Sequence, residues 1–172
     1  TSDGTDIAWE AAGGSGITYK SEGTNFTSSL IIGHDTTGTL DAAERNTAVG
    51  LTAMDAITSG DMNTAVGYAA MSANNTGVRN TAFGDNSMVT NTSGNYNTAV
   101  GQLSLQVNST GSGNTALGYQ ALTSTDDGDY NTAIGYYAMQ ASGNDADYNV
   151  AIGYYALGSA DVSGNANVAI GY

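Results

Sequence analysis

The sequence predicts an all-β chain folded as a parallel β-solenoid, and three observations lead to this fold class. A motif of the type Asn-Thr-Ala-Val-Gly recurs eight times at intervals of 17 or 18 residues, and a short fixed period is the signature of stacked repeats. The fourth motif position is always large and apolar. The 172 residues include 24 glycines and no proline, as expected where turns are tight and every interior strand needs its backbone N–H groups.

Taken in order along the chain, residues 1–28 contain no copy of the motif, and we expect them to form an N-terminal connector or cap. The repeat array covers residues 29–172. Its first copy is degenerate and starts at Ser29. The remaining copies start at Asn46, Asn63, Asn80, Asn97, Asn114, Asn131, Asn149 and Asn167.

Each coil of 17 or 18 residues has room for two short strands and two turns, but not for two helices, and its apolar positions do not follow a helical period. We expect the first strand at the motif and the second to start near an Ala-Met pair such as Ala53-Met54. Glycines three residues before the motif Asn mark turns. Successive coils then pair along the axis at about 4.8 Å.

Alternation along the first strand places Thr64 and Val66 on one face and Ala65 and Gly67 on the other. The small residues suit the inside of a flat coil, so we expect the large column to point outward, with the reverse assignment left open. An apolar row cannot face water, and its simplest cover is another copy of the chain. The predicted packing column of this homo-oligomer is Val49, Val66, Phe83, Val100, Leu117, Ile134, Ile152 and Ile170.

The motif asparagines predict a structural ladder in which stacked amides hydrogen-bond along the axis and satisfy a turn. Its expected members are the eight asparagines at which the full motif copies start. A row of ligand-binding amides is the alternative, and no other feature of the sequence supports it.

Composition excludes several classes of function. Sixteen acidic residues against three basic ones, a formal net charge of -13, exclude a protein that neutralises nucleic-acid phosphates or anionic lipid. No apolar run approaches the about 20 residues of a membrane-spanning helix, so we expect no membrane insertion. The chain has no Cys and a single His, His34, so we expect no enzyme, no catalytic residue and no cofactor.

The acidic turns leave bound calcium as an alternative to the expectation of no cofactor. Acidic residues are ordinary turn formers, but oxygen-rich loops also bind Ca²⁺. The column two places before the motif Asn is rich in Asp and Asn, although Val78 and Ser112 interrupt it. The candidate calcium ligands are Asp126, Asp127, Asp129, Asp145 and Asp147.

Tyrosines recur directly after the motif glycine in several coils. Stacked tyrosines cover a solenoid edge or fill a chain interface, and this structural interpretation is the favoured one. The alternative is contact with a glycan, since a tyrosine offers an apolar ring and a hydrogen-bonding tip. The candidates for glycan contact are Tyr136, Tyr137, Tyr154 and Tyr155.

Two segments, Asn149-Val-Ala-Ile-Gly153 and Asn167-Val-Ala-Ile-Gly171, resemble repeats in the head domains of trimeric autotransporter adhesins. Asn63-Thr-Ala-Val-Gly-Tyr68 and Asn114-Thr-Ala-Leu-Gly-Tyr-Gln-Ala-Leu122 are similar to repeats of phage tail-fibre-like proteins. This resemblance covers residues 29–172 and implies a left-handed parallel β-roll, with three chains intertwined or side by side in an extracellular fibre. The coils are longer than those of the adhesin heads.

We therefore expect a non-enzymatic structural and adhesive segment of a phage tail fibre or similar virion appendage that takes part in host attachment. Its partners would be its own copies in a homotrimer and a host-surface glycan or protein receptor. One alternative is a bacterial surface adhesin head with the same fold. A minor alternative is an ice-binding solenoid, because Thr47, Thr64 and Thr81 begin a column in register, although Val150 and Val168 continue it as a packing face would.

Overall fold

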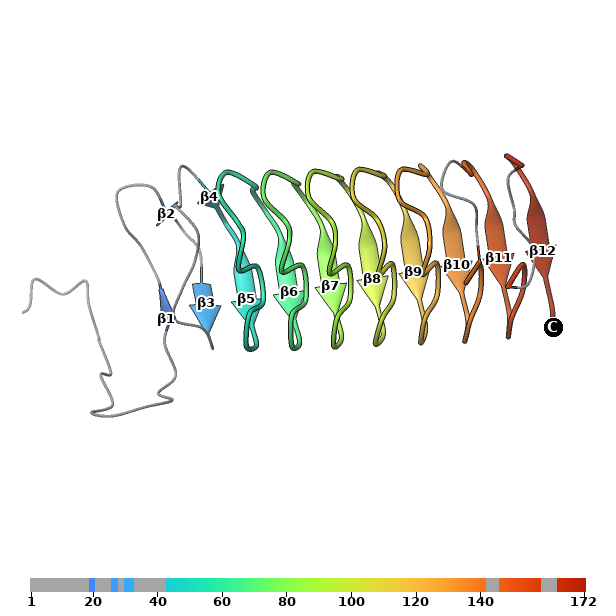
Figure 1. Cartoon of the computed structure of the whole chain (residues 1–172), viewed down its shortest axis with the longest axis horizontal. Helices are drawn as coiled ribbons and strands as arrows, with labels where there is room; N and C mark the ends of the chain where they lie inside the picture. Colours follow the sequence, from blue (N-terminus) through green and yellow to red (C-terminus); the bar gives the residue numbers. More distant parts are fainter. Residues whose placement is uncertain (1–18, 21–25, 28–29, 33–42, 142–145, 159–163) are drawn as a thin grey trace, which may run out of the picture.

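The computed structural model describes residues 19–20, 26–27, 30–32, 43–141, 146–158 and 164–172. In this part of the chain, coils stack into a rod with their strands side by side (Figure 1). The described elements are β-strands, and none of these residues is helical. The predicted all-β parallel solenoid with coils of about 17 residues is confirmed.

Ten strands form one sheet in the order β1-β3-β5-β6-β7-β8-β9-β10-β11-β12. Each motif copy supplies one three-residue strand, and like positions pair in parallel, as Thr64 pairs with Thr81 and Val66 with Phe83. The motif strands are β5 (Thr47–Val49), β6 (Thr64–Val66), β7 (Thr81–Phe83), β8 (Thr98–Val100), β9 (Thr115–Leu117), β10 (Thr132–Ile134), β11 (Val150–Ile152) and β12 (Val168–Ile170).

The N-terminal end of the sheet is built differently. The degenerate first copy supplies β3 (Leu30–Ile32), which pairs in parallel with β5, while β1 (Tyr19–Lys20) pairs antiparallel with β3 and is the first strand of the sheet. A separate pair joins β2 (Phe26–Thr27) to β4 (Ala43–Glu44). Of the expected connector or cap at 1–28, all residues other than 19–20 and 26–27 lie outside the described residues.

The alternation along each motif strand places the small residue inside the coil. The seven middle alanines from Ala48 to Ala151 are fully buried, whereas Phe83 and Leu117 are 56% and 46% exposed. The motif glycine that follows is needed for the same reason: a Cβ on Gly67 would lie 2.4 Å from the carbonyl oxygen of Gly84 in the next coil. The expected inside-outside assignment is confirmed, because only Ala and Gly fit between the backbones of so thin a coil.

The second strand expected near Ala53-Met54 is wrong. These residues form a tight turn in which Thr52 and Met54 have φ angles of 58° and 54°, and the same two positions are left-handed in the coils that follow. The backbone still pairs between coils, since the N–H of Met54 donates to the carbonyl of Ala70 at 3.0 Å. Left-handed residues reverse the chain within a few residues, so each described coil from Asn46 onward closes with one strand instead of two.

Burial offsets the strain of this turn. A left-handed conformation costs about 1–2 kcal/mol for a residue with a Cβ, but the second left-handed side chain of each turn points into the core. Burying a side chain of this size stabilises by about 1.5–3 kcal/mol. The fully buried members of this column are Met54, Met71, Met88, Leu105, Leu122 and Met139.

Candidate functional site

The motif asparagines form a continuous hydrogen-bonded ladder along the rod. The backbone N–H of Asn63 donates to Oδ1 of Asn46 at 2.9 Å, and Nδ2 of Asn63 donates to the carbonyl of Gly77 at 2.8 Å. The bond to the preceding Oδ1 repeats in every coil as far as Asn167. Because these amides are buried from Asn46 to Asn149 and hydrogen-bonded within the protein, this column offers no row of free amides to a ligand.

A second buried ladder, which the sequence reasoning missed, lies beside the first, since Nδ2 of Asn63 and Nδ2 of Asn74 both donate to the carbonyl of Gly77. Nδ2 of Asn91 donates to Oδ1 of Asn74 at 2.7 Å, and Nδ2 of Asn108 donates to Oδ1 of Asn91 at 3.0 Å. The sequence feature that could have revealed this ladder is the spacing of 17 residues between these asparagines. Each also begins an Asn-x-Ser/Thr triplet of the glycosylation type, but the three side chains are fully buried and closed to modification in the folded chain.

Thr125 takes the place of asparagine in the next coil of this second ladder. Its Oγ1 is buried and has no hydrogen-bond partner in the described part of the chain. A buried polar atom left without a partner costs about 1–3 kcal/mol. The ladder is therefore weakest at the coil that contains Thr125.

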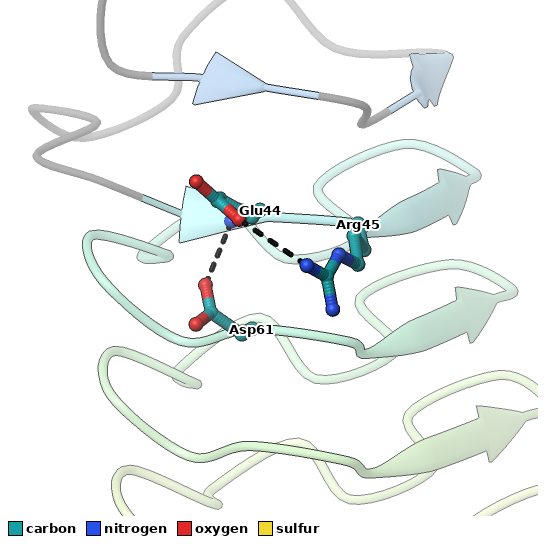
Figure 2. A network of polar contacts seen from close by, with 3 residues as sticks. All are labelled: Glu44, Arg45 and Asp61. Atoms are coloured by element: carbon teal, nitrogen blue, oxygen red, sulfur yellow. Dashed lines mark hydrogen bonds and ion pairs between the residues drawn. The ribbon is translucent and has the colours of Figure 1, made fainter.

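The acidic column two places before the motif Asn is a third ladder, on the surface. Oδ1 of Asp129 accepts the N–H of Ser112 at 2.7 Å, and Oδ1 of Asp147 accepts the N–H of Asp129 at 2.8 Å. Ser112 keeps an oxygen at its position, because its Oγ accepts the N–H of Asn95. Figure 2 shows the first rung, where Asp61 accepts the N–H of Glu44 beside an ion pair between Glu44 and Arg45.

These bonds give the Asp and Asn residues of the column a structural role. Asp126 also accepts a backbone N–H, from Ser109 at 3.2 Å. Across the described residues, no group of three or more His, Cys, Asp or Glu side chains could hold a metal ion. Asp127 belongs to the same turn as Asp126, and Asp145 and His34 lie outside the described residues.

The tyrosines of the last coils form a compact group that we call the tyrosine strip. Rings of one row stack along the axis: Tyr119 on Tyr136 at 5.1 Å between centroids, Tyr136 on Tyr154 at 5.4 Å, and Tyr154 on Tyr172 at 5.3 Å. Tyr137 packs edge to face against Tyr136 at 4.3 Å and against Tyr155 at 6.0 Å. The strip thus consists of Tyr119, Tyr136, Tyr137, Tyr154, Tyr155 and Tyr172.

The strip brings together all four predicted glycan-contact residues and adds Tyr119 and Tyr172. A hydrogen bond with Tyr136, together with partial desolvation, raises the pKa of Tyr137 to about 12. The Tyr137 hydroxyl therefore stays protonated well above physiological pH. A second, smaller stack on another column joins Tyr130 and Tyr148 at 5.3 Å.

The outer sheet face, formed by the second and fourth motif positions, is the other candidate surface. Strands β5–β12 contain only Thr, Ala, Val, Phe, Leu and Ile, so this face has no charge. Thr64, Thr81 and Thr98 are exposed beside the apolar column. The predicted packing column is thus in register on one flat face, and its role between chains stays a prediction.

No family model, curated protein or solved structure that was compared with the chain matches it. The likeness of its repeats to tail-fibre and adhesin repeats therefore remains a resemblance between motifs. Among the described residues, no helix is long and apolar enough to cross a membrane.

Proposed function

We propose that the chain is a non-enzymatic structural segment of an extracellular fibre, a phage tail fibre or similar virion appendage, and that three chains assemble through their outer sheet faces. The observation that carries the proposal is the uncharged sheet face with exposed large side chains such as Phe83 and Leu117. A row of this kind is unfavourable in water and marks an interaction surface. The repeats resemble those of trimeric, left-handed β-rolls, which supports three copies.

The mechanism of such a segment is mechanical. Each inner coil is hydrogen-bonded to both neighbours through the backbone and through the motif-asparagine ladder, and the other two ladders add side-chain bonds in some coils. Bending the rod therefore requires these bonds to distort together. Three such rods around one axis would bury their apolar columns and present every outer surface three times. Repetition of a weak contact raises the overall strength of attachment without any new contact.

Light scattering tests the assembly. We expect the purified chain to have the native mass of three chains of 17.3 kDa. Replacing Phe83 and Leu117 together by Asp should reduce this mass to that of one folded chain, because charges cannot be buried unpaired. The matched control replaces Leu51 and Tyr68 together by Asp, which places the same two charges at exposed sites off the sheet face, and it should keep three chains.

A folded wild-type monomer would contradict the trimer. If the oligomer dissociates only when a chelator is added, the acidic turns would instead be calcium sites. The bacterial adhesin head predicts the same mass, and the neighbouring genes separate it from the virion appendage: virion genes support the fibre, whereas a membrane-anchor domain in the full gene supports the adhesin.

Ice binding is the second candidate, and the exposed, regularly spaced hydroxyls of Thr64, Thr81 and Thr98 favour it. An ice-binding face has to stay open, whereas a packing face is covered in the assembly. Thermal hysteresis from a monomer would therefore favour ice binding over the fibre. No thermal hysteresis from a trimer would exclude it.

A further inference from the structure

We propose that the tyrosine strip binds a neutral, linear polysaccharide along the axis of the rod. This deepens the attachment part of the proposed function by naming a class of ligand and its site. The strip follows the carboxyl ends of the motif strands and does not belong to the outer sheet face, so sugar binding and assembly through that face can be tested with separate variants.

The fold does not require tyrosine at these positions. Other coils have Leu51, Asp85 and Gln102 in the column of Tyr136, and Asn86 and Leu103 in the column of Tyr137. Asn86 and Leu103 adopt the same left-handed backbone as Tyr137. The repeat therefore acts as its own control: one backbone accepts other side chains, Tyr68 is isolated in its column, and tyrosines follow the motif glycine in consecutive coils only from Tyr119 onward.

Stacking determines which part of each ring a ligand can reach. Both faces of Tyr136 are covered, one by Tyr119 and the other by Tyr154, yet the residue is 44% exposed. The accessible parts of such a ring are its edge and its hydroxyl. Ring edges are electropositive and hydroxyls donate hydrogen bonds, so the strip suits a ligand that is rich in acceptor oxygens and also has apolar C–H patches, as a sugar does.

The spacing of the strip suits a polymer. Ring centroids along the row are 5.1, 5.4 and 5.3 Å apart, close to the advance of one hexose in an extended β-linked chain. Successive sugars would then meet equivalent surroundings on successive coils. The rings are already held by one another, so little side-chain freedom is lost on binding.

Charge selects a neutral polymer over an acidic one. No Lys or Arg follows Arg79 in the sequence, and the chain has a net charge of -13. Sulfate, carboxylate and phosphate groups are typically held by Arg or Lys, and none of these residues is present in the coils that contain the strip. Acidic polysaccharides and anionic lipid headgroups would be repelled.

Affinity electrophoresis of the full chain in gels that contain soluble β-1,4-glucan tests this proposal, with dextran sulfate as the acidic comparison. We expect retardation by the neutral glucan alone. The strip variant replaces Tyr136 and Tyr154 by Gln and Tyr137 and Tyr155 by Leu, the residues of the coil that starts at Asn97. We expect it to weaken binding about tenfold or more, as loss of several aromatic contacts does at other interfaces.

The matched control removes the other tyrosine stack. Tyr130 and Tyr148 become Gly, the residue that Gly113 provides in the same column, and retardation should stay as in the wild type. A third variant, Gln102→Tyr, extends the row by one coil beyond Tyr119 and should strengthen binding. This gain would not follow from a merely structural role of the tyrosines.

Three outcomes would overturn the proposal. The first is that neither β-1,4-glucan nor β-1,4-mannan retards the folded wild type. The second is that the strip variant and its control lose binding equally. The third is that the native mass of the strip variant falls, which would make the strip a contact between chains. The assembly is tested separately. If the double variant Phe83→Asp with Leu117→Asp dissociates into single chains that still bind glucan, glucan binding by the strip does not require the trimer. The same conclusion follows if the wild type forms no trimer and still binds glucan.

Discussion

The inside and the outer edges of the coils differ in how much they vary along the rod. Inside, the same residue types recur in every described coil: Ala in the strand, Asn in the ladder, and Met or Leu in the turn. Outside, the residue after the motif glycine is Leu51, Tyr68, Asp85 or Gln102 in successive coils. The inner columns therefore specify the fold, and the outer ones are free to differ between the two ends of the rod.

The largest expected effect is Gly84→Ala, which adds one methyl group between two coils. Its Cβ would lie 2.5 Å from the carbonyl oxygen and 2.6 Å from the carbonyl carbon of Gly101, at a φ of 144°. The backbone of the next coil cannot move away without breaking the hydrogen bonds between the coils. We expect a loss of about 3–5 kcal/mol in the free energy of unfolding, from strain and overpacking together.

Urea denaturation measures this loss. Asp85→Ala changes the neighbouring exposed residue and should alter stability by less than about 0.5 kcal/mol. Equal effects at the two positions would contradict the division between a specified inside and a tolerant outside.

A smaller loss is expected from Asn91→Leu, in the middle of the second buried ladder. Leucine has a similar shape but makes none of the amide hydrogen bonds, so Oδ1 of Asn74 loses the donor that Asn91 provides. With about 1–3 kcal/mol for each buried group left unpaired, we expect a loss of about 2–4 kcal/mol by the same urea measurement.

Asn75→Leu is the matched control for this ladder variant. Asn75 is exposed, and water can replace the hydrogen bond that its side chain accepts from Thr58. Its stability should therefore remain near that of the wild type. A harmless Asn91→Leu would mean that the amide column packs without contributing hydrogen-bond stability.

The smallest effect is a gain. Thr125→Asn should continue the second ladder by one coil, since an amide at this position can donate to Oδ1 of Asn108 as Asn108 donates to Asn91. We expect about 1 kcal/mol of added stability, visible as a higher midpoint of thermal unfolding. Thr125→Val is the control, since it removes the hydroxyl without adding an amide. Unchanged stability of this variant would agree with an unpartnered Oγ1. A clear loss of stability would show that the hydroxyl has a partner and would contradict the prediction.

Much of the fold could be predicted because the repeat aligns the sequence with itself. The period, the motif strand and the inward position of Ala65 all follow from residues that recur in register. The turn at Thr52–Met54 could not be predicted in this way, because Met, Leu and Thr rarely adopt positive φ. No feature of the neighbouring sequence indicates a left-handed residue when its strain is offset by burial between coils.

The candidate surfaces divide in the same way. The tyrosine columns, the apolar column and the oxygen-rich column were all visible as types of residue at a fixed spacing. Their contacts were not: a column of Asp, Asn and Ser residues is compatible with calcium ligands until it is known that the N–H of Ser112 donates to Asp129 and the N–H of Asp129 donates to Asp147. The second Asn ladder was missed because Asn74 lies in a turn where asparagine is ordinary.

The sequence by itself determined the length of the coil, the parallel register and the identity of each column, because one residue type at one spacing can satisfy every coil in the same way. Only the tertiary structure decided that the coil closes with a single strand, that the acidic oxygens accept backbone N–H groups, and that tyrosine rings cover one another's faces. These features depend on atoms that are 17 or 18 residues apart in the chain and meet only when coils stack.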